Sequence, residues 1–157
     1  WLKWVDDILK QRQIVVSEYS ILRPTSPFRT QCTIKRAFDQ FHKHGDADTL
    51  RAVQKVTEHP GKMWIEKSGE LVPLLPFSND LEFWHNSQTN TLPKVFVQNA
   101  SLEILLPNNI RKYGSITGRH IVPFETQGWE GFDINTEDDF VMAERIFGDW
   151  KINAQID

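Results

Sequence analysis

The chain has 157 residues, of which 39 % are hydrophobic and 25 % charged, a mixture typical of a globular domain with its own core. Its formal net charge of −3 argues against a dedicated nucleic-acid binder, because such proteins usually carry a basic excess. No apolar run approaches the roughly 18 residues of a membrane helix, and the single Cys32 can form no internal disulfide, so we expect a cytoplasmic protein without membrane contact.

Residues 1–56 predict the beginning of an α/β fold. Apolar residues spaced i, i+3, i+4, i+7 predict helices over residues 1–11 and 32–44. Residues 14–22 and 49–56 are rich in apolar and β-branched side chains, which indicates buried strands. A strand, a helix and a second strand in this order predict a right-handed crossover between parallel strands. The apolar face of the first helix would carry Trp1, Trp4, Val5 and Ile8.

Residues 57–94 interrupt this pattern. They contain four prolines, two glycines and no long helical period, so we interpret them as an inserted hairpin subdomain that serves dimerisation. The α/β core would then comprise residues 1–56 and 95–157. Thr136 and Asp139 have the spacing of a capping box before the last helix. The second part of the core is expected to contain strands at 95–105 and 116–124 and helices at 107–112 and 137–150.

The sequence RPTSPFRT, residues 23–30, follows directly on a predicted strand. In open α/β sheets ligands bind beyond the carboxyl ends of the strands, so this loop lies where a ligand would bind. Pro24 and Pro27 stiffen it. A stiff loop would hold four side chains for an anionic ligand, namely Arg23, Thr25, Ser26 and Arg29. The alternative is a rigid turn that caps the next helix and leaves the arginines in solvent.

Asp133 and Asn135 are candidate ligands of a hard cation. In an extended segment their side chains point to the same side, because strand side chains alternate. Two oxygen ligands side by side suit a Mg²⁺ ion that keeps most of its water and binds a substrate phosphate. The alternative has Asn135 as the N-cap of the last helix, with the acids at 137–139 as solvated residues near its positive end.

Two further motifs allow both a functional and a structural interpretation. Lys62 follows the tight turn Pro60-Gly61 and is either a contact for a phosphate or carboxylate or ordinary surface. Asn99 and Ser101 interrupt an apolar strand, where they either meet a ligand hydroxyl or satisfy the backbone.

Four segments, in their order and spacing, resemble the acylneuraminate (sialic acid) cytidylyltransferase family. Together they extend over most of the chain. They are LRPTSPFRT at 22–30, EHPGKMW at 58–64, LPKVFVQNAS at 92–101 and DINTEDDF at 133–140.

The resemblance implies a Rossmann-like α/β fold, a three-layer sandwich akin to that of glycosyltransferase-A nucleotidyltransferases, with a small inserted subdomain. It implies the transfer of CMP from CTP to an acidic nine-carbon sugar, with release of pyrophosphate and a requirement for Mg²⁺. It also implies a homodimer in which the inserted subdomain reaches the neighbour's site.

Roles for individual residues are carried over from the same resemblance. Asp133 and Lys62 would be catalytic, and Asp133 and Asn135 would hold the metal. The substrate contacts would come from Arg23, Thr25, Ser26, Arg29, Lys62, Gln98, Asn99 and Ser101.

The sequence departs from the family pattern around the sugar. Arg23 stands for a glutamine, Asn135 for the second metal-binding aspartate, Glu103 for a tyrosine and Thr89 for an arginine. A nucleotidyltransferase for another sugar is therefore an alternative. The family's first strand and its triphosphate-gripping loop have no counterpart here, so this chain alone is expected not to turn over CTP. A non-catalytic dimerisation or binding module that keeps the fold is the third interpretation.

Overall fold

The computed structural model of the chain describes residues 1–75 and 84–153, which form two compact units. One unit combines residues 1–54 with the chain from residue 98 onward, and the other comprises residues 55–97. Among the described residues, no helix has the length and apolar character needed to cross a membrane.

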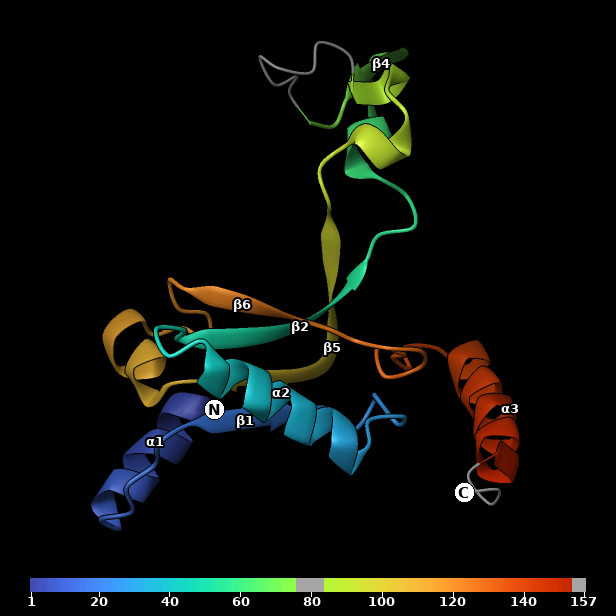
Figure 1. The fold of residues 1–157 in the computed structure, drawn as a ribbon. Coiled ribbons are helices and arrows are strands. Elements are labelled where there is room, and N and C mark those ends of the chain that lie inside the picture. The colour runs from blue at the N-terminus through green and yellow to red at the C-terminus, as the bar shows by residue number, and fades with distance from the viewer. Residues whose placement is uncertain (76–83, 154–157) are drawn as a thin grey trace. The chain divides into compact units, whose positions relative to one another are not determined.

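The first unit is mixed α/β and is built on a four-stranded sheet (Figure 1). β1 runs antiparallel to β5, with Leu22 opposite Leu102. β2 runs parallel to β6, with Leu50 opposite Val122. The strands lie in the order β1 (Tyr19–Leu22), β5 (Phe96–Leu105), β2 (Thr49–Lys55) and β6 (Ile121–Glu125).

β1 and β2, the two strands of the predicted crossover, are not neighbours in the sheet. β5 lies between β1 and β2 and runs antiparallel to β1, so the sheet is not an all-parallel Rossmann sheet. An apolar, β-branched run indicates a buried strand, but it specifies neither the neighbouring strand nor its direction. That choice depends on contacts between segments far apart in the sequence.

The strand predicted over residues 14–22 is formed only by its last four residues. Helix α1 (Leu2–Gln11) ends in a Schellman motif, in which Gln13 is left-handed with φ 56°. The N–H of Ile14 donates to a carbonyl in the last helical turn over 2.9 Å, and Val15 is 95 % exposed. These apolar residues therefore belong to the end of the helix and the loop that follows it.

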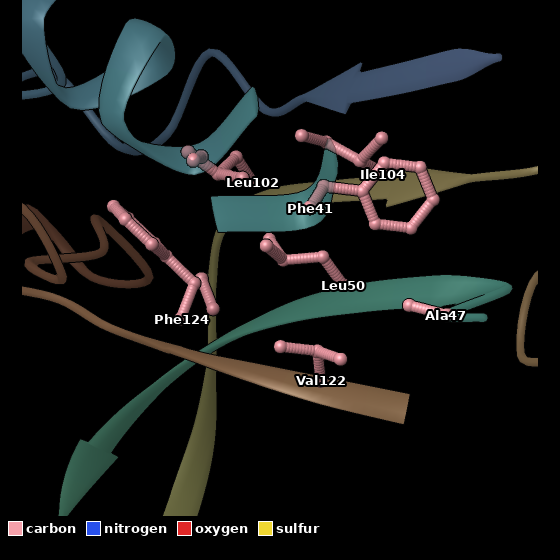
Figure 2. Packing of buried hydrophobic residues seen from close by; sticks show 9 residues of the cluster. Phe41, Ala47, Leu50, Leu102, Ile104, Val122 and Phe124 are labelled. Atoms are coloured by element: carbon pink, nitrogen blue, oxygen red, sulfur yellow. The ribbon is translucent and has the colours of Figure 1, made fainter. Parts of the chain in front are cut away.

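Helix α2 (Gln31–Lys43), which confirms the helix predicted at 32–44, packs on one face of the sheet (Figure 2). Ala37 and Phe41 lie one turn apart on the helix, and they meet side chains that alternate along the strands. One stripe of the helix thus faces one side of the sheet. The buried members of this core are Ala37, Phe41, Ala47, Leu50, Ala52, Leu102, Ile104, Val122 and Phe124.

The first helix buries a different face from the one predicted. Trp1 and Trp4 are 77 % and 67 % exposed, whereas Leu2 and Asp6 are buried. Ion pairs and a hydrogen bond hold the Asp6 carboxylate inward, and this orientation turns both indoles outward. The second apolar cluster consists of Leu2, Leu105 and Ile110, with Val5, Tyr19, Ile21 and Ile116 packed against it.

Helix α3 (Glu137–Asn153) begins with the predicted capping box. The hydroxyl of Thr136 accepts the N–H of Asp139 over 3.2 Å, and the carboxylate of Asp139 accepts the N–H of Thr136 over 2.8 Å. The helix is attached to the rest of its unit through a small apolar cluster made of Phe28, Phe132, Ile134, Ala143 and Ile146.

The second unit contains a hairpin and short 3₁₀ turns. Strands β3 (Trp64–Lys67) and β4 (Glu70–Pro73) pair antiparallel. The turn residues Ser68 and Gly69 are both left-handed, with φ 54° and 87°, as a two-residue hairpin turn requires. His59 is buried, and both of its ring nitrogens are hydrogen-bonded to backbone groups of the same unit.

Thr30 caps helix α2, and the loss of this cap should be measurable. Its hydroxyl accepts the N–H of Thr33 over 3.1 Å, and the hydroxyl of Thr33 accepts the N–H of Thr30 over 3.2 Å. Thr30→Ala is expected to lower the free energy of unfolding by about 1 kcal/mol, because the first helical turn loses an acceptor. Urea denaturation measures the change, with Thr30→Ser as the control that keeps the hydroxyl. An equal loss in both variants would contradict the capping role.

Candidate functional site

The loop after β1 meets the middle of β5 in the folded chain. Because β1 is antiparallel to β5, the end of β1 at Leu22 lies opposite Leu102. The Arg29 guanidinium donates to the carbonyl of Ser101, and also to the carbonyl of Arg23 over 3.1 Å. One arginine therefore ties both ends of the loop to the central strand.

The same loop is joined to the segment that leads into α3. The N–H of Ile134 donates to the carbonyl of Thr25 over 2.9 Å. The rings of Phe28 and Phe132 lie edge to face, with centroids 5.8 Å apart. Three segments far apart in the sequence, residues 23–30, 101–103 and 132–134, thus meet in one unit.

Three side-chain oxygens around this junction are buried and unpaired. The hydroxyls of Ser26 and Ser101 and one carboxylate oxygen of Asp133 find no hydrogen-bond partner in the described part of the chain. Ser26 is 3 % exposed and Ser101 is fully buried. Buried polar atoms are nearly always partnered in folded proteins, so each of these oxygens requires a further hydrogen-bond partner, either ordered water or a ligand.

The charge at the junction comes mainly from arginines. Arg29 is half-buried, and burial lowers the pKa of its guanidinium, which still remains protonated. Arg23 is exposed and lies 3.9 Å from the carboxylate of Glu103. The structural interpretation of the loop placed both arginines in solvent. This agrees with the exposed Arg23 but not with the half-buried Arg29.

A cavity of about 560 Å³ opens at the end of β1. Arg23 and Pro24 of the loop, Ile21 of the strand and Trp1 contribute to its walls. Small-molecule sites commonly measure about 300–1,000 Å³, so the cavity could hold a ligand of that size.

Gln98 is bound to an arginine that the sequence analysis did not identify. Arg51 donates to the side-chain oxygen of Gln98 over 2.6 Å and to the hydroxyl of Thr117 over 2.7 Å. The same guanidinium lies 3.5 Å from the buried carboxylate of Glu103. The one available signal was Glu103 itself, a charged residue within the apolar stretch LEIL.

Asn99 supports the backbone-satisfying interpretation. Its amide donates to the hydroxyl of Thr126 over 2.9 Å, and its carbonyl accepts the N–H of Ser101 over 3.2 Å. Gly131 approaches so closely that an added Cβ would lie 2.7 Å from the Asn99 amide nitrogen. Asn99 thus joins β5 to the loop after β6.

The segment before α3 presents one ligand suited to a metal. Thr136, not Asn135, is the N-cap, and the Asn135 side chain is exposed. Hydrogen bonds from the N–H of Asn135 and from Thr136 lower the pKa of Asp139. Nowhere in residues 1–75 and 84–153 do three or more His, Cys, Asp or Glu residues gather as a metal cluster. Asp133 fits a Mg²⁺ ion that a phosphate ligand brings with it, because such ions need only one or two carboxylates.

Glu130 is a second residue that the sequence analysis missed. Its carboxylate accepts hydrogen bonds from Thr33, Arg36 and the N–H of Gln127. Burial alone would raise the pKa of Glu130, but these hydrogen bonds outweigh burial, so the pKa is lowered. Nothing in the run GWEGF distinguished this acid from a solvated one.

Lys62 belongs to the other unit, residues 55–97. Its backbone N–H closes the predicted tight turn by donating to the carbonyl of His59 over 2.8 Å. Its side chain is exposed, with the ammonium 3.4 Å from the carbonyl of His85.

The fold and the site together define a mixed α/β protein with cationic donors and unpaired buried oxygens at one junction. No protein-family model matches this chain, and comparison with curated proteins gives no match either. The junction offers arginine and hydroxyl donors to an anion. It offers a cation one oxygen of Asp133 that has no partner among the described residues.

Proposed function

We propose that this chain serves a cytidylyltransferase, which transfers CMP from CTP to an acidic nine-carbon sugar and releases pyrophosphate. The observation that carries the proposal is the junction itself. The loop 23–30, β5 at Ser101 and the segment at Asp133 belong to three of the four resembling motifs, and they meet with unpaired buried oxygens.

The proposal includes a Rossmann-like fold of the glycosyltransferase-A type with three layers. Its support is that α2 packs on one face of the sheet, whereas α1 belongs to the cluster around Leu105. Leu105 directly follows Ile104 in β5, so their side chains point to opposite faces. Because β1 pairs antiparallel with β5, the proposed fold would have to be a variant with a mixed sheet.

In the proposed reaction the anomeric hydroxyl of the sugar attacks the α-phosphorus of CTP. A new oxygen–phosphorus bond forms as the bond to the pyrophosphate leaving group breaks, and the hydroxyl proton passes to solvent. Arg29 and the hydroxyls of Ser26 and Ser101 hold phosphate or sugar oxygens, and Asp133 would hold a Mg²⁺ ion. Bound Mg²⁺ would neutralise charge on the phosphates. Such transfer depends mainly on positioning and charge stabilisation.

Lys62 is proposed to bind the carboxylate of the acidic sugar. Lys62→Ala is expected to raise KM for the sugar about tenfold and KM for CTP less than twofold, because only the sugar carries a carboxylate. Steady-state kinetics with each substrate varied in turn measures both constants. Lys67→Ala, an exposed lysine of the same unit, is the matched control. An unchanged sugar KM would make Lys62 ordinary surface.

A nucleotidyltransferase for another sugar is the first alternative, and one contact favours it. Arg23 and Glu103, two of the departures from the family pattern, lie 3.9 Å apart as an ion pair. Both residues are uncharged in the family pattern and carry opposite charges here. Charged side chains exchanged as a pair beside the cavity would suit a different substrate. Screening sugars and nucleoside triphosphates separates this alternative from the main proposal.

A non-catalytic binding module is the second alternative. Asn135 supplies no charge for a metal, and its side chain is exposed. Calorimetry of CTP binding with and without Mg²⁺ decides, because tight metal-dependent binding counts against this alternative.

The proposal also includes a homodimer and a cytoplasmic location. The hairpin of the second unit exposes several large apolar side chains, among them Trp64 and Leu71, at 43 % and 66 %. A second copy could cover them, since a two-stranded hairpin is marginal alone. In the cytoplasm the exposed Cys32 would stay reduced.

The test uses the complete gene product that contains this chain. Release of pyrophosphate is measured with CTP, Mg²⁺ and a panel of acidic nine-carbon sugars, with reactions lacking sugar or containing a chelator as controls. Sugar-dependent and metal-dependent release supports the proposal. No release with any nine-carbon acid contradicts it.

A further inference from the structure

Glu130 fastens the segment that carries Asp133 to helix α2. One carboxylate oxygen accepts the hydroxyl of Thr33 over 2.7 Å and a guanidinium N–H of Arg36 over 2.8 Å. The other accepts Arg36 over 2.6 Å and the backbone N–H of Gln127 over 2.8 Å. Two donors on α2 and one in the loop after β6 thus converge on a single carboxylate.

This contact is anchored in the core and is not a loose surface ion pair. The Glu130 side chain is 17 % exposed, and Thr33 is fully buried. The Arg36 guanidinium lies 4.9 Å from the centre of the Phe124 ring, which belongs to the main core cluster. Because the surrounding contacts already restrict these side chains, forming the ion pair costs little additional side-chain conformational entropy.

Asp133 lies between two fixed points of the backbone. Glu130 is tied to α2, and the N–H of Ile134 donates to the carbonyl of Thr25 over 2.9 Å. Between them, Phe132 packs against the ring of Phe28. The unpaired oxygen of Asp133 has no hydrogen bond of its own to orient it within the described chain, so its direction must come from the backbone on either side.

We propose that Glu130 is a positioning residue, which holds the backbone of residues 130–134 so that the Asp133 carboxylate is aimed at the cation of the proposed site. The inference rests on the proposed function for the identity of the cation. A carboxylate that binds a metal needs such support, because small displacements of a ligand weaken the site.

The test compares Glu130→Gln with wild type in the complete protein. Hydrogen exchange at the Ile134 amide is expected to become about tenfold faster, while the amides of Leu50 and Leu102 in the core strands keep their rates. The Mg²⁺ concentration for half-maximal CTP binding, measured by calorimetry, is expected to rise about tenfold. At saturating Mg²⁺, CTP affinity should change less than twofold. Asp138→Asn, which removes an exposed acid nearby, is the matched control and should change none of these.

Arg36→Lys is the milder second variant, in case Glu130→Gln fails to fold. It keeps the charge and is expected to show the same two changes to a smaller extent. An unchanged Ile134 exchange rate or an unchanged Mg²⁺ requirement in the folded variants overturns the positioning role. If wild type binds no CTP in a Mg²⁺-dependent manner, the proposed function fails instead, and the exchange rates still decide whether Glu130 holds the segment.

Discussion

Asp133→Ala is expected to lower kcat of the proposed cytidylyltransferase activity by at least about 10²-fold and to leave the free energy of unfolding nearly unchanged. The carboxylate has one buried oxygen without a partner, so its removal breaks no hydrogen bond of that atom within the described residues. Loss of the metal ligand, in contrast, removes charge stabilisation that the proposed transfer requires. Kinetics at saturating CTP and urea denaturation measure the two quantities.

Two further variants make this result specific. Asp138→Asn removes an exposed carboxylate at the start of α3 and should keep wild-type kcat. Asp133→Asn keeps one oxygen and should fall between wild type and Asp133→Ala. A wild-type kcat in Asp133→Ala would exclude Asp133 from metal binding.

Asp6→Asn is expected to destabilise the first unit by about 1–3 kcal/mol, because the buried side chain loses its charge-assisted hydrogen bonds. The Asp6 carboxylate is 2 % exposed and lies 2.7 Å from both Arg111 and Lys10. The hydroxyl of Tyr19 donates to it over 2.8 Å. Urea denaturation at neutral pH measures the loss.

The partners of Asp6 provide a graded control. Lys10 is 47 % exposed, so Lys10→Gln is expected to cost no more than about 1 kcal/mol. If Asp6→Asn unfolds at the same urea concentration as wild type, the network contributes nothing to stability.

The same network predicts how stability depends on pH. The hydrogen bond from Arg111 lowers the pKa of Asp6 below 3.8, against burial, and Lys10 and Tyr19 add to this effect. The stabilisation is thus complete above pH 3.8 and is lost as the pH falls toward the folded pKa. Burial and the hydrogen bond to Asp6 raise the pKa of Tyr19 to about 12 from 10.0, so this second contribution is lost as the pH rises between those values. Unfolding followed against pH should show both losses in wild type and a weaker acid loss in Asp6→Asn.

The local sequence pattern was sufficient to locate the two helices after the first. The helices predicted at 32–44 and 137–150 are observed at Gln31–Lys43 and Glu137–Asn153, and the capping box at Thr136 is confirmed. Residues 14–18 show where local pattern fails. Their apolar side chains resemble a strand, but a left-handed Gln13 ends the helix and turns the chain before the strand begins.

For the candidate site, the sequence indicated which residues carry suitable side chains, but it did not indicate how they are arranged in space. Arg29, Ser26 and Asp133 stood out as polar groups in a stiff loop or before a helix. The loop was expected beyond the carboxyl end of a strand, but nothing in the sequence indicated that an antiparallel β5 passes the end of β1 and brings Ser101 to the loop. Glu130 gave no signal at all, because its partners lie on a helix almost a hundred residues earlier, at Thr33 and Arg36.

The sequence by itself determined where helices begin and end, which residues carry charge or hydroxyls, and that the chain has enough apolar side chains for a core. Only the tertiary structure decided the order and direction of the strands, the burial of Asp6 and the contact of Glu130 with α2. The reason is physical: periodicity and capping act within a few residues, whereas strand pairing and buried ion pairs depend on segments that the chain brings together only when the whole unit folds.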